Sequence, residues 1–238
     1  MSVINSQYKI NILLYHQIGD KPTSETNLDC FCNKNQFYRQ MLFLYESKCH
    51  VVSLDFAIDL VQNSKTIDFN YVVLTFDDGC ESFYDLAFPI LNSFGFNATV
   101  YPITGFLGQK AIINSKKYNH LKVMSKEMII ELSEKGINFG AHTKNHFRLT
   151  ELSNSEAEYQ IINSKFHLEE ILGKQIDSFS YPHGNYNERI IDILKNSGFS
   201  KAMTCYSDSL SNIYSRFEIP RKYVTYFDDI DSFQHKLK

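Results

Sequence analysis

Short apolar runs alternate with longer stretches of helical period along most of this chain. Apolar side chains that recur every three to four residues predict helices over 35–48, 82–94, 125–135, 153–172 and 187–196. The runs that predict strands are 9–15, 51–54, 71–76, 98–103, 137–141, 178–181 and 201–205. A glycine follows most of the helical stretches, as expected of residues that end helices.

This alternation predicts a mainly parallel α/β architecture. The run at 71–76 is apolar on both faces, which is typical of a buried parallel strand. A series of about seven strand–helix units favours a barrel over an open sheet, and we expect one domain over residues 1–238. Functional side chains in such barrels follow the carboxyl ends of the strands, so the candidate chemistry is sought there.

Composition and charge exclude several classes of protein. The 238 residues contain 27 acidic residues and 24 lysines and arginines, a net charge of −3 that predicts no general attraction to nucleic acid or anionic lipid. The chain shows no signal peptide and no apolar run long enough to span a membrane, which predicts a cytoplasmic protein.

Five cysteines, an odd number without a CxxC pair, disfavour a disulfide scaffold and fit a reducing compartment. Cys30 and Cys32 flank a single residue and are interpreted as loop thiols, with a zinc-binding pair as the weaker alternative.

Two adjacent carboxylates, Asp77 and Asp78, come directly after the run at 71–76 and precede Gly79. Carboxylates at the end of an apolar strand are costly to bury unless a partner compensates their charge, and a divalent metal ion would do so. Asp-Asp-Gly is also good turn and helix-cap chemistry, so the pair alone leaves both interpretations open.

A second motif, from His142 to His146, follows the run at 137–141. Histidines four residues apart lie on one face of a helix, so we expect a helix here that brings both imidazoles to one ion. Two histidines and one aspartate with open positions would match a catalytic zinc site, and the second aspartate would be free to act as a base.

Three further groups belong to the expected rim. Pro182 and Gly184 predict a rigid turn that can present a backbone N–H to a developing oxyanion, although an ordinary strand–helix turn uses the same residue types. His16 follows the first strand. Arg221 can pair with one of the aspartates and lower its pKa, or it can lie on the surface.

In their order and approximate spacing these motifs resemble those of the polysaccharide deacetylases, the family-4 carbohydrate esterases that share the NodB homology domain. The similarity extends from about residue 9 to about residue 225 and looks greatest to the branch that contains the poly-N-acetylglucosamine deacetylases. The segments that carry it are Leu13-Leu14-Tyr15-His16, Val73-Leu74-Thr75-Phe76-Asp77-Asp78-Gly79, Gly140-Ala141-His142-Thr143-Lys144-Asn145-His146, Phe179-Ser180-Tyr181-Pro182-His183-Gly184 and Ile219-Pro220-Arg221.

The resemblance implies a distorted (β/α)7 barrel that hydrolyses the N-acetyl group of an N-acetylated glycan to acetate and a free amine. It also implies a divalent metal, for which Zn²⁺ is the first expectation and Co²⁺, Ni²⁺, Mn²⁺ or Fe²⁺ are alternatives. Asp78, His142 and His146 match the metal ligands of the family, and Asp77 matches its general base.

The remaining roles also follow from the resemblance alone. His16 matches the catalytic acid, which this branch carries near the start of the chain. His183, beside Pro182 and Tyr181 on the expected substrate side, matches the residue whose backbone N–H stabilises the oxyanion. Arg221 is the candidate that orients the base.

Some features leave the substrate open. Ser180 stands where many family members have an arginine that tunes the base, and the chain contains no tryptophan. The segment 108–120 would shape the substrate pocket, and the missing signal peptide favours an intermediate of surface-polysaccharide biosynthesis. The alternatives are an O-acetyl esterase, an amidase acting on a non-glycan substrate, or a catalytically idle sugar-binding module. The sequence does not indicate the oligomeric state.

Overall fold

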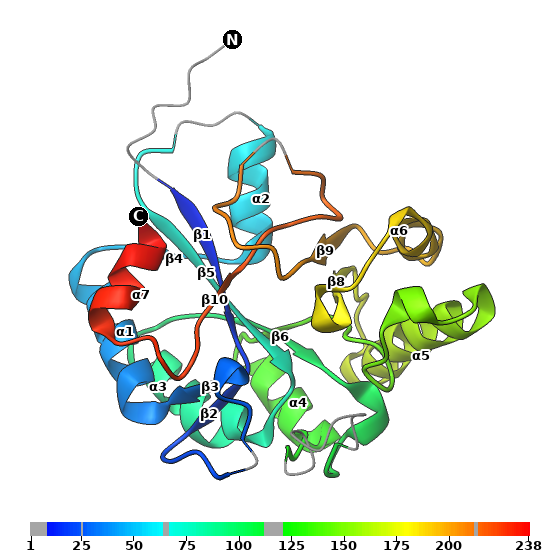
Figure 1. The fold of residues 1–238 in the computed structure, drawn as a ribbon, viewed down its shortest axis with the longest axis horizontal. Helices are drawn as coiled ribbons and strands as arrows, with labels where there is room; N and C mark the ends of the chain where they lie inside the picture. Colours follow the sequence, from blue (N-terminus) through cyan, green and yellow to red (C-terminus); the bar gives the residue numbers. More distant parts are fainter. Residues whose placement is uncertain (1–8, 25, 64–66, 112–120, 212–213) are drawn as a thin grey trace.

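Parallel strands form the centre of the molecule in a computed structural model, in which β1 and β5 cross the middle of the view (Figure 1). The structure describes residues 9–24, 26–63, 67–111, 121–211 and 214–238. Most of the rim segment expected at 108–120 therefore lies outside the described residues, as do residues 1–8.

The strands are β1 (Ile10–Tyr15), β2 (Gln17–Gly19), β3 (Phe31–Asn33), β4 (His50–Val51), β5 (Tyr71–Asp78), β6 (Thr99–Pro102), β7 (Asn138–Phe139), β8 (Ser178–Ser180), β9 (Lys201–Met203) and β10 (Lys222–Tyr223).

Helices pack around these strands, with α1, α3 and α7 on one side of the view and α5 and α6 on the other (Figure 1). They are α1 (Lys34–Glu46), α2 (Leu54–Gln62), α3 (Phe88–Ser93), α4 (Lys126–Glu134), α5 (Asn154–Leu172), α6 (Glu188–Asn196) and α7 (Ile230–Leu237). Every residue of β1 and β5 is buried, which explains why both strands are mostly apolar, apart from Asn11 in β1 and Thr75 and the two aspartates in β5.

The strands close into a ring. The order β10–β1–β5–β6–β7 is parallel throughout, and β8 pairs with β9 in the same sense. Single parallel bridges, Ala141 with Phe179 and Met203 with Ile219, join these two groups of strands. Because two of the junctions are single bridges, the ring is a distorted barrel, as expected from the sequence.

Local signals in the sequence explain several elements. Ser153 and Glu156 form a reciprocal capping box at the start of α5, and Gly173 ends the helix in the left-handed conformation with φ 63°. The strand expected at 51–54 is wrong at its end: β4 stops at Val51, and Ser53 caps α2 by accepting a hydrogen bond from the Phe56 N–H. Helices α2 and α7 and strands β2, β3 and β10 were not expected.

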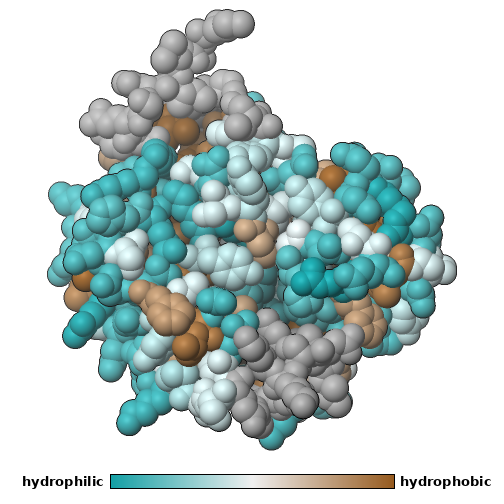
Figure 2. Space-filling model, viewed as in Figure 1, coloured by the Kyte–Doolittle hydropathy of each residue, from teal (hydrophilic) through white to brown (hydrophobic). Residues whose placement is uncertain are grey.

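In the part of the chain that the structure describes, every helix is too short or too polar to cross a bilayer. The face of the molecule in Figure 2 is largely hydrophilic, and its hydrophobic residues form small separate patches.

Candidate metal centre and active site

Polar side chains from distant parts of the chain meet at one end of the barrel. Because the barrel strands are parallel, the residues at or just after their carboxyl ends share one rim. This rim holds residues that end β1, β5 and β8 or follow them and β7: His16, Asp77, Asp78, His142, His146 and Ser180. Arg221 precedes β10, and its side chain reaches the rim at Asp77.

Asp78, His142 and His146 form a compact buried cluster. The Nε2 atoms of both histidines lie 3.5 Å from Oδ1 of Asp78, and the potential ligand atoms of the three residues lie within 4.8 Å of one another. Nδ1 of His142 lies 2.8 Å from the carbonyl oxygen of Ser180. When Nδ1 carries the proton it donates to this carbonyl, and the lone pair of Nε2 faces Asp78.

The protonation states of this cluster fit a bound divalent cation. Asp78 is 1% exposed, and neither of its carboxylate oxygens has a hydrogen-bond partner in the described part of the chain. Burial raises the pKa of Asp78, but the two histidines outweigh burial and hold the pKa well below its ordinary value. Burial lowers the pKa of His146 to about 3, so this ring is neutral. The ionised carboxylate of Asp78 and the neutral ring of His146 are in the states that these two ligands of a His₂Asp metal site require.

The expected helix across His142 and His146 is wrong, because the segment is a loop. Thr143 and His146 have positive φ angles of 64° and 60°, which interrupt any helix. The hydroxyl of Thr143 accepts a hydrogen bond from the His146 N–H at 2.9 Å. Two left-handed residues thus bring both rings to Asp78 without a helical turn.

Neighbouring elements hold this loop in place. Gln160 of α5 accepts hydrogen bonds from the backbone N–H groups of Lys144 and Asn145, at 3.2 and 2.8 Å. Gly105, after β6, donates its N–H to the Lys144 carbonyl at 2.8 Å, and a Cβ at this glycine would lie 2.4 Å from that oxygen. The metal-site loop therefore rests on backbone contacts that only a glycine at 105 permits.

Backbone strain gathers at the same place. Of the five non-glycine residues with positive φ in the described part of the chain, four belong to this rim: Asp78, Thr143, His146 and His183. Such conformations cost free energy and persist where the surrounding contacts impose them, as functional sites commonly do. Their grouping supports a functional role for the rim.

Asp77 is held by Arg221 in a fully buried ion pair. Nη1 and Nη2 of Arg221 donate to Oδ1 and Oδ2 of Asp77, both at 2.7 Å. The other N–H groups of the guanidinium reach the Thr204 carbonyl and the hydroxyls of Thr75 and Ser180. Burial raises the pKa of Asp77, but the charge of Arg221 outweighs burial and lowers it to about 2.

Ser180 stands where many family members have an arginine, and its hydroxyl links Arg221 to Asp77. Its hydroxyl accepts from Nη2 of Arg221 and donates to Oδ2 of Asp77, both at 2.8 Å. The short side chain leaves room for the guanidinium of Arg221, which arrives from a different part of the chain. The carboxylate of Asp77 is thereby fixed by two neighbours.

His16 lies beside this ion pair. In the parallel pairing of β1 with β5, Tyr15 stands opposite Phe76, so His16 follows on the same rim as Asp77. The ring is 8% exposed and stacks on Tyr223 with centroids 5.5 Å apart. Burial lowers the pKa of His16, but its electrostatic interactions with Cys30 and with the carboxylates of Asp78 and Asp77 outweigh burial and raise it to about 9.

Of the three residues after β8 that we expect on the substrate side, Tyr181, Pro182 and His183, the side chains of the first two are buried. Tyr181 is 0% exposed, and its hydroxyl donates to the Phe217 carbonyl, so its side chain packs in the core instead of facing a substrate. Side chains alternate along a strand, and Ser180 already points to Asp77, so Tyr181 must point away. Pro182 is buried as well. His183 is exposed, and its ring lies 4.4 Å from that of His146.

Two contact residues of His16, Cys30 and Tyr223, were not among the expected site residues. Tyr223 is one of many aromatic residues and carries no motif that would single it out. His16 directly precedes β2 and Cys30 directly precedes β3, and the parallel pairing of these two strands of three residues leaves no periodic signal in the sequence.

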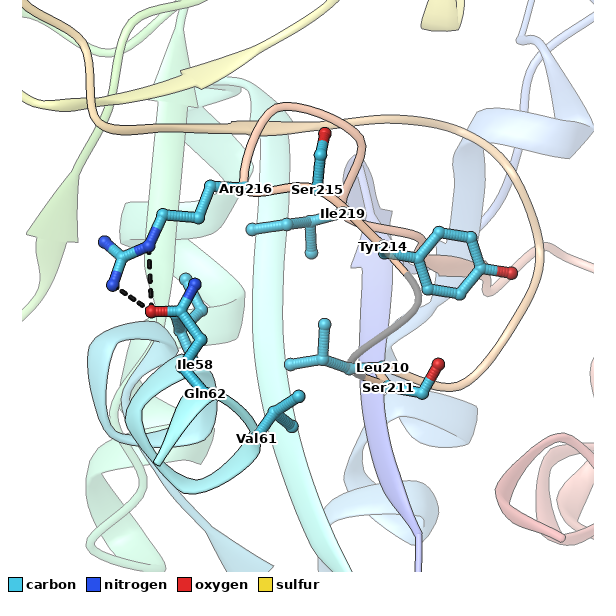
Figure 3. A pocket seen from close by; sticks show the side chains of 9 residues that line it. All are labelled: Ile58, Val61, Gln62, Leu210, Ser211, Tyr214, Ser215, Arg216 and Ile219. Atoms are coloured by element: carbon cyan, nitrogen blue, oxygen red, sulfur yellow. Dashed lines mark hydrogen bonds between the residues drawn. The ribbon is translucent and has the colours of Figure 1, made fainter. Parts of the chain in front are cut away.

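A separate hollow of about 270 Å³ lies between α2 and the segment 210–219 (Figure 3). Ile58, Val61 and Leu210 contribute to its lining, and Arg216 donates to the side-chain oxygen of Gln62 at its edge. Among the described residues that line it there is no histidine or carboxylate, so the hollow offers no acid–base or metal chemistry.

Comparison with known proteins shows the family of this chain and its fold. A family model described as "Polysaccharide deacetylase" matches residues 64–202. The candidate polysaccharide deacetylase YxkH of Bacillus subtilis is 25% identical over 91% of this chain and 72% of its own length. A poly-β-1,6-N-acetyl-D-glucosamine N-deacetylase of Staphylococcus epidermidis is 28% identical over 65% of this chain, which spans about half (54%) of that relative. The solved structure of the Streptococcus pyogenes deacetylase PplD in complex with acetate superimposes with a TM-score of 0.84, at 23% identity over 97% of this chain and 98% of the other.

Proposed function

Because this chain belongs to the polysaccharide deacetylase family and has its distorted (β/α)7 barrel, we propose that it is a metal-dependent N-deacetylase of an N-acetylated glycan. The products are acetate and a glycan with a free amine. Two of the residues that we assign to the site, His16 and Arg221, lie outside the matched region 64–202. The support for their roles is therefore the contacts that their side chains make in this structure.

One observation carries the proposal: the buried carboxylate of Asp78 faces two histidines, each with Nε2 at 3.5 Å, beside a second carboxylate fixed by Arg221. The first group has the donors that Zn²⁺ prefers. The second holds a carboxylate ionised in a buried site, as a general base requires. A glycan amide needs both, because its carbonyl is a poor electrophile.

The metal ion, when held by Asp78, His142 and His146, supplies Lewis acidity for the acetyl carbonyl and for the attacking water. Asp77 takes a proton from that water, and Arg221 with Ser180 keeps the carboxylate in the orientation for this transfer. The backbone N–H of His183 is assigned to the oxyanion that develops at the carbonyl.

His16 is assigned the proton donor to the leaving nitrogen. An amine leaves readily only when it is protonated, so an acid is required in addition to the base. The raised pKa of His16 keeps its ring protonated at neutral pH in the metal-free protein, beside two carboxylates.

The substrate class rests on the relatives. The Staphylococcus epidermidis relative is named for poly-β-1,6-N-acetyl-D-glucosamine, and we therefore assign a GlcNAc-type oligo- or polysaccharide to this chain. Zn²⁺ is the metal we assign, because the donor set is two histidines and one aspartate.

Acetate release from N-acetylglucosamine oligomers tests the proposal. We expect activity in the zinc-loaded protein, loss with a chelator and recovery when Zn²⁺ is added back. His142→Ala should lose both bound metal, by mass spectrometry, and activity, with an unchanged circular dichroism spectrum. His50→Ala is the matched control, because His50 is exposed and pairs in β4 with Tyr71, at the opposite end of β5 from the two aspartates.

Other outcomes would replace the proposal. Release of acetate from an O-acetylated ester but from no N-acetyl sugar would make the protein an esterase. Glycan binding without acetate release at any metal loading would make it a sugar-binding module.

A further inference from the structure

We propose that a hollow beside the metal-site loop binds a neutral sugar residue of the same glycan chain whose N-acetyl group is hydrolysed at the metal centre. This hollow, called the α5 hollow below, lies between α5 and the segment after β6 and has a volume of about 400 Å³. Small-molecule sites in proteins typically enclose roughly 300–1,000 Å³. The inference rests on the proposed function and adds to it a second binding point for the glycan.

The inner wall of the α5 hollow belongs to the rim that carries the metal site. Two of its residues, Thr104 and Gly105, follow β6, which pairs with the end of β5. A third, Lys144, lies in the loop between the two histidines of the metal site. The Thr104 N–H donates to the Thr143 carbonyl at 3.3 Å, and the Gly105 N–H donates to the Lys144 carbonyl. The wall is therefore continuous with the metal-site loop.

The outer wall is one face of α5, a helix on the outside of the barrel (Figure 1). It consists of Asn163, Phe166, His167 and Glu170, whose spacing of three, four and seven residues places them side by side on the helix. Phe166 is 64% exposed, and no other aromatic ring of the described residues contacts it. An exposed aromatic ring thus stands at the edge of the hollow.

Several polar groups of the lining have no partner among the described residues. Thr104 is 2% exposed, and its hydroxyl makes no hydrogen bond there. The side chains of His167 and Glu170 form no hydrogen bond or ion pair with described residues. The amide of Asn163 donates to the Tyr159 carbonyl at 2.8 Å, which leaves its oxygen as an acceptor. Buried polar groups in proteins are normally hydrogen-bonded, so a ligand with several hydroxyls fits this lining.

This combination of groups fits a sugar. The apolar C–H face of a pyranose packs on an aromatic ring such as that of Phe166, while its hydroxyls donate to and accept from polar side chains. The charges of Lys144 and Glu170 are opposite, and Nζ of Lys144 is already bound by Tyr159, at 2.7 Å from the hydroxyl and 4.8 Å from the ring centroid. The lining therefore favours a neutral ligand over an anion such as phosphate.

The first experiment measures binding without turnover. The chain contains no tryptophan, so Phe166→Trp places a single indole at the α5 hollow. The zinc-loaded variant also carries Asp77→Asn, so that the substrate is not consumed, and is titrated with an N-acetylglucosamine pentamer. Its indole emission should change saturably. Tyr45→Trp in the same background is the matched control, because Tyr45 is 61% exposed on α1, and its emission should not change.

The second experiment separates binding of the chain from chemistry at the metal. Phe166→Ala should raise the KM for the pentamer about tenfold, as expected for the loss of one aromatic contact, and should change kcat less than twofold. Turnover of 4-nitrophenyl acetate should not change, because this small ester occupies only the metal site. Phe166→Tyr should keep the KM of the wild type, since it keeps the ring, and so should Tyr45→Ala.

The outcomes separate this inference from the proposed function. An unchanged KM in Phe166→Ala together with a constant emission in Phe166→Trp overturns the sugar site at the α5 hollow. An equal loss on the pentamer and on the ester also overturns it, because the effect then lies at the metal centre. A saturable change of emission in a protein whose wild type releases no acetate from any oligomer supports sugar binding at the hollow and overturns the proposed function.

Discussion

Asp77 and Asp78 are neighbours in the chain, yet their surroundings differ in kind. Asp77 is bound by Arg221 through both carboxylate oxygens, whereas the oxygens of Asp78 have no hydrogen-bond partner in the described part of the chain. Asp78 ends β5 with a positive φ of 68°, which departs from extended strand geometry, and its carboxylate faces the histidines, whereas that of Asp77 meets the guanidinium. Both aspartates can be recognised as candidate site residues in the sequence, because they come at the end of an apolar run. Their different surroundings are seen only in the structure.

Asp77→Asn tests this separation. The variant should still bind one Zn²⁺, because Asp78, His142 and His146 remain, while acetate release falls roughly 10²–10⁴-fold as expected for a lost general base. Mass spectrometry of the dialysed protein and a turnover assay measure the two effects. Loss of the ion in this variant would mean that the roles of the two aspartates are exchanged.

The Asp77–Arg221 pair also predicts a pH dependence of stability. The folded-state pKa of Asp77 is lowered to about 2, so its contribution is complete above the ordinary pKa of an aspartate and is lost as the pH falls through about 2. Protonation should remove about 2 kcal/mol from the free energy of unfolding of the metal-free protein between pH 5 and pH 2. At neutral pH, Asp77→Asn should cost roughly 3 kcal/mol, since it leaves Arg221 buried without its charged partner.

Urea denaturation of the two proteins at several pH values measures this effect. The stability difference between wild type and Asp77→Asn should shrink as the pH falls from 5 to 2. A constant difference across that range would contradict the assigned pair.

At the scale of elements, the sequence predicts the helices and strands that have strong local signals. It does not predict segments whose conformation depends on contacts with distant parts of the chain. Helix α5 has its capping box and its terminal glycine, and it was predicted at its observed position. The loop from His142 to His146 was predicted as a helix, because a spacing of four suggests one. Contacts with α5 and with the segment after β6 impose the loop, and no local pattern reveals them.

Gly105→Ala tests whether the segment after β6 supports the metal site. A methyl group there would lie 2.4 Å from the Lys144 carbonyl and 2.7 Å from the side-chain oxygen of Asn145, so the loop must move. We expect a loss of about 1–3 kcal/mol of stability and about tenfold weaker zinc binding, measured by calorimetry. Gly173→Ala is the control: its methyl group meets no atom within 4 Å, so zinc binding should not change.

At the scale of the whole molecule, the alternation of strands and helices favoured a barrel over an open sheet, and the family resemblance implied its distorted (β/α)7 form. The exact closure was not predictable, because β10 has two residues and two of the junctions are single bridges. The partners of Arg221 were not predictable in full for the same reason. Its motif can be recognised in the sequence, but its hydrogen bonds to residues of β5, β8 and the segment after β9 form only in the closed ring. The single domain expected over residues 1–238 stays a prediction.

Metal binding should stabilise the whole barrel, since the ligands come from β5 and from the loop after β7. A ligand that binds only the folded state at 100 times its dissociation constant adds about 2.7 kcal/mol of stability. For a chain of this size that is a rise in Tm of roughly 5–10 °C. Zn²⁺ should raise the Tm of the wild type in differential scanning calorimetry but leave that of Asp78→Asn unchanged. An equal rise in both would indicate binding elsewhere.

The pairing of the last strand with the first has a consequence for folding kinetics. Leu13 lies opposite Lys222 in the β1–β10 pair, and Arg221 reaches Asp77 across 144 residues of chain. Contacts between such distant segments form slowly, because the chain must lose much of its entropy before they bring any gain. Helices with local caps should therefore form early in refolding. The ion pair between Asp77 and Arg221 should form only when the barrel closes. A nascent or refolding chain should regain its circular dichroism signal before it releases any acetate.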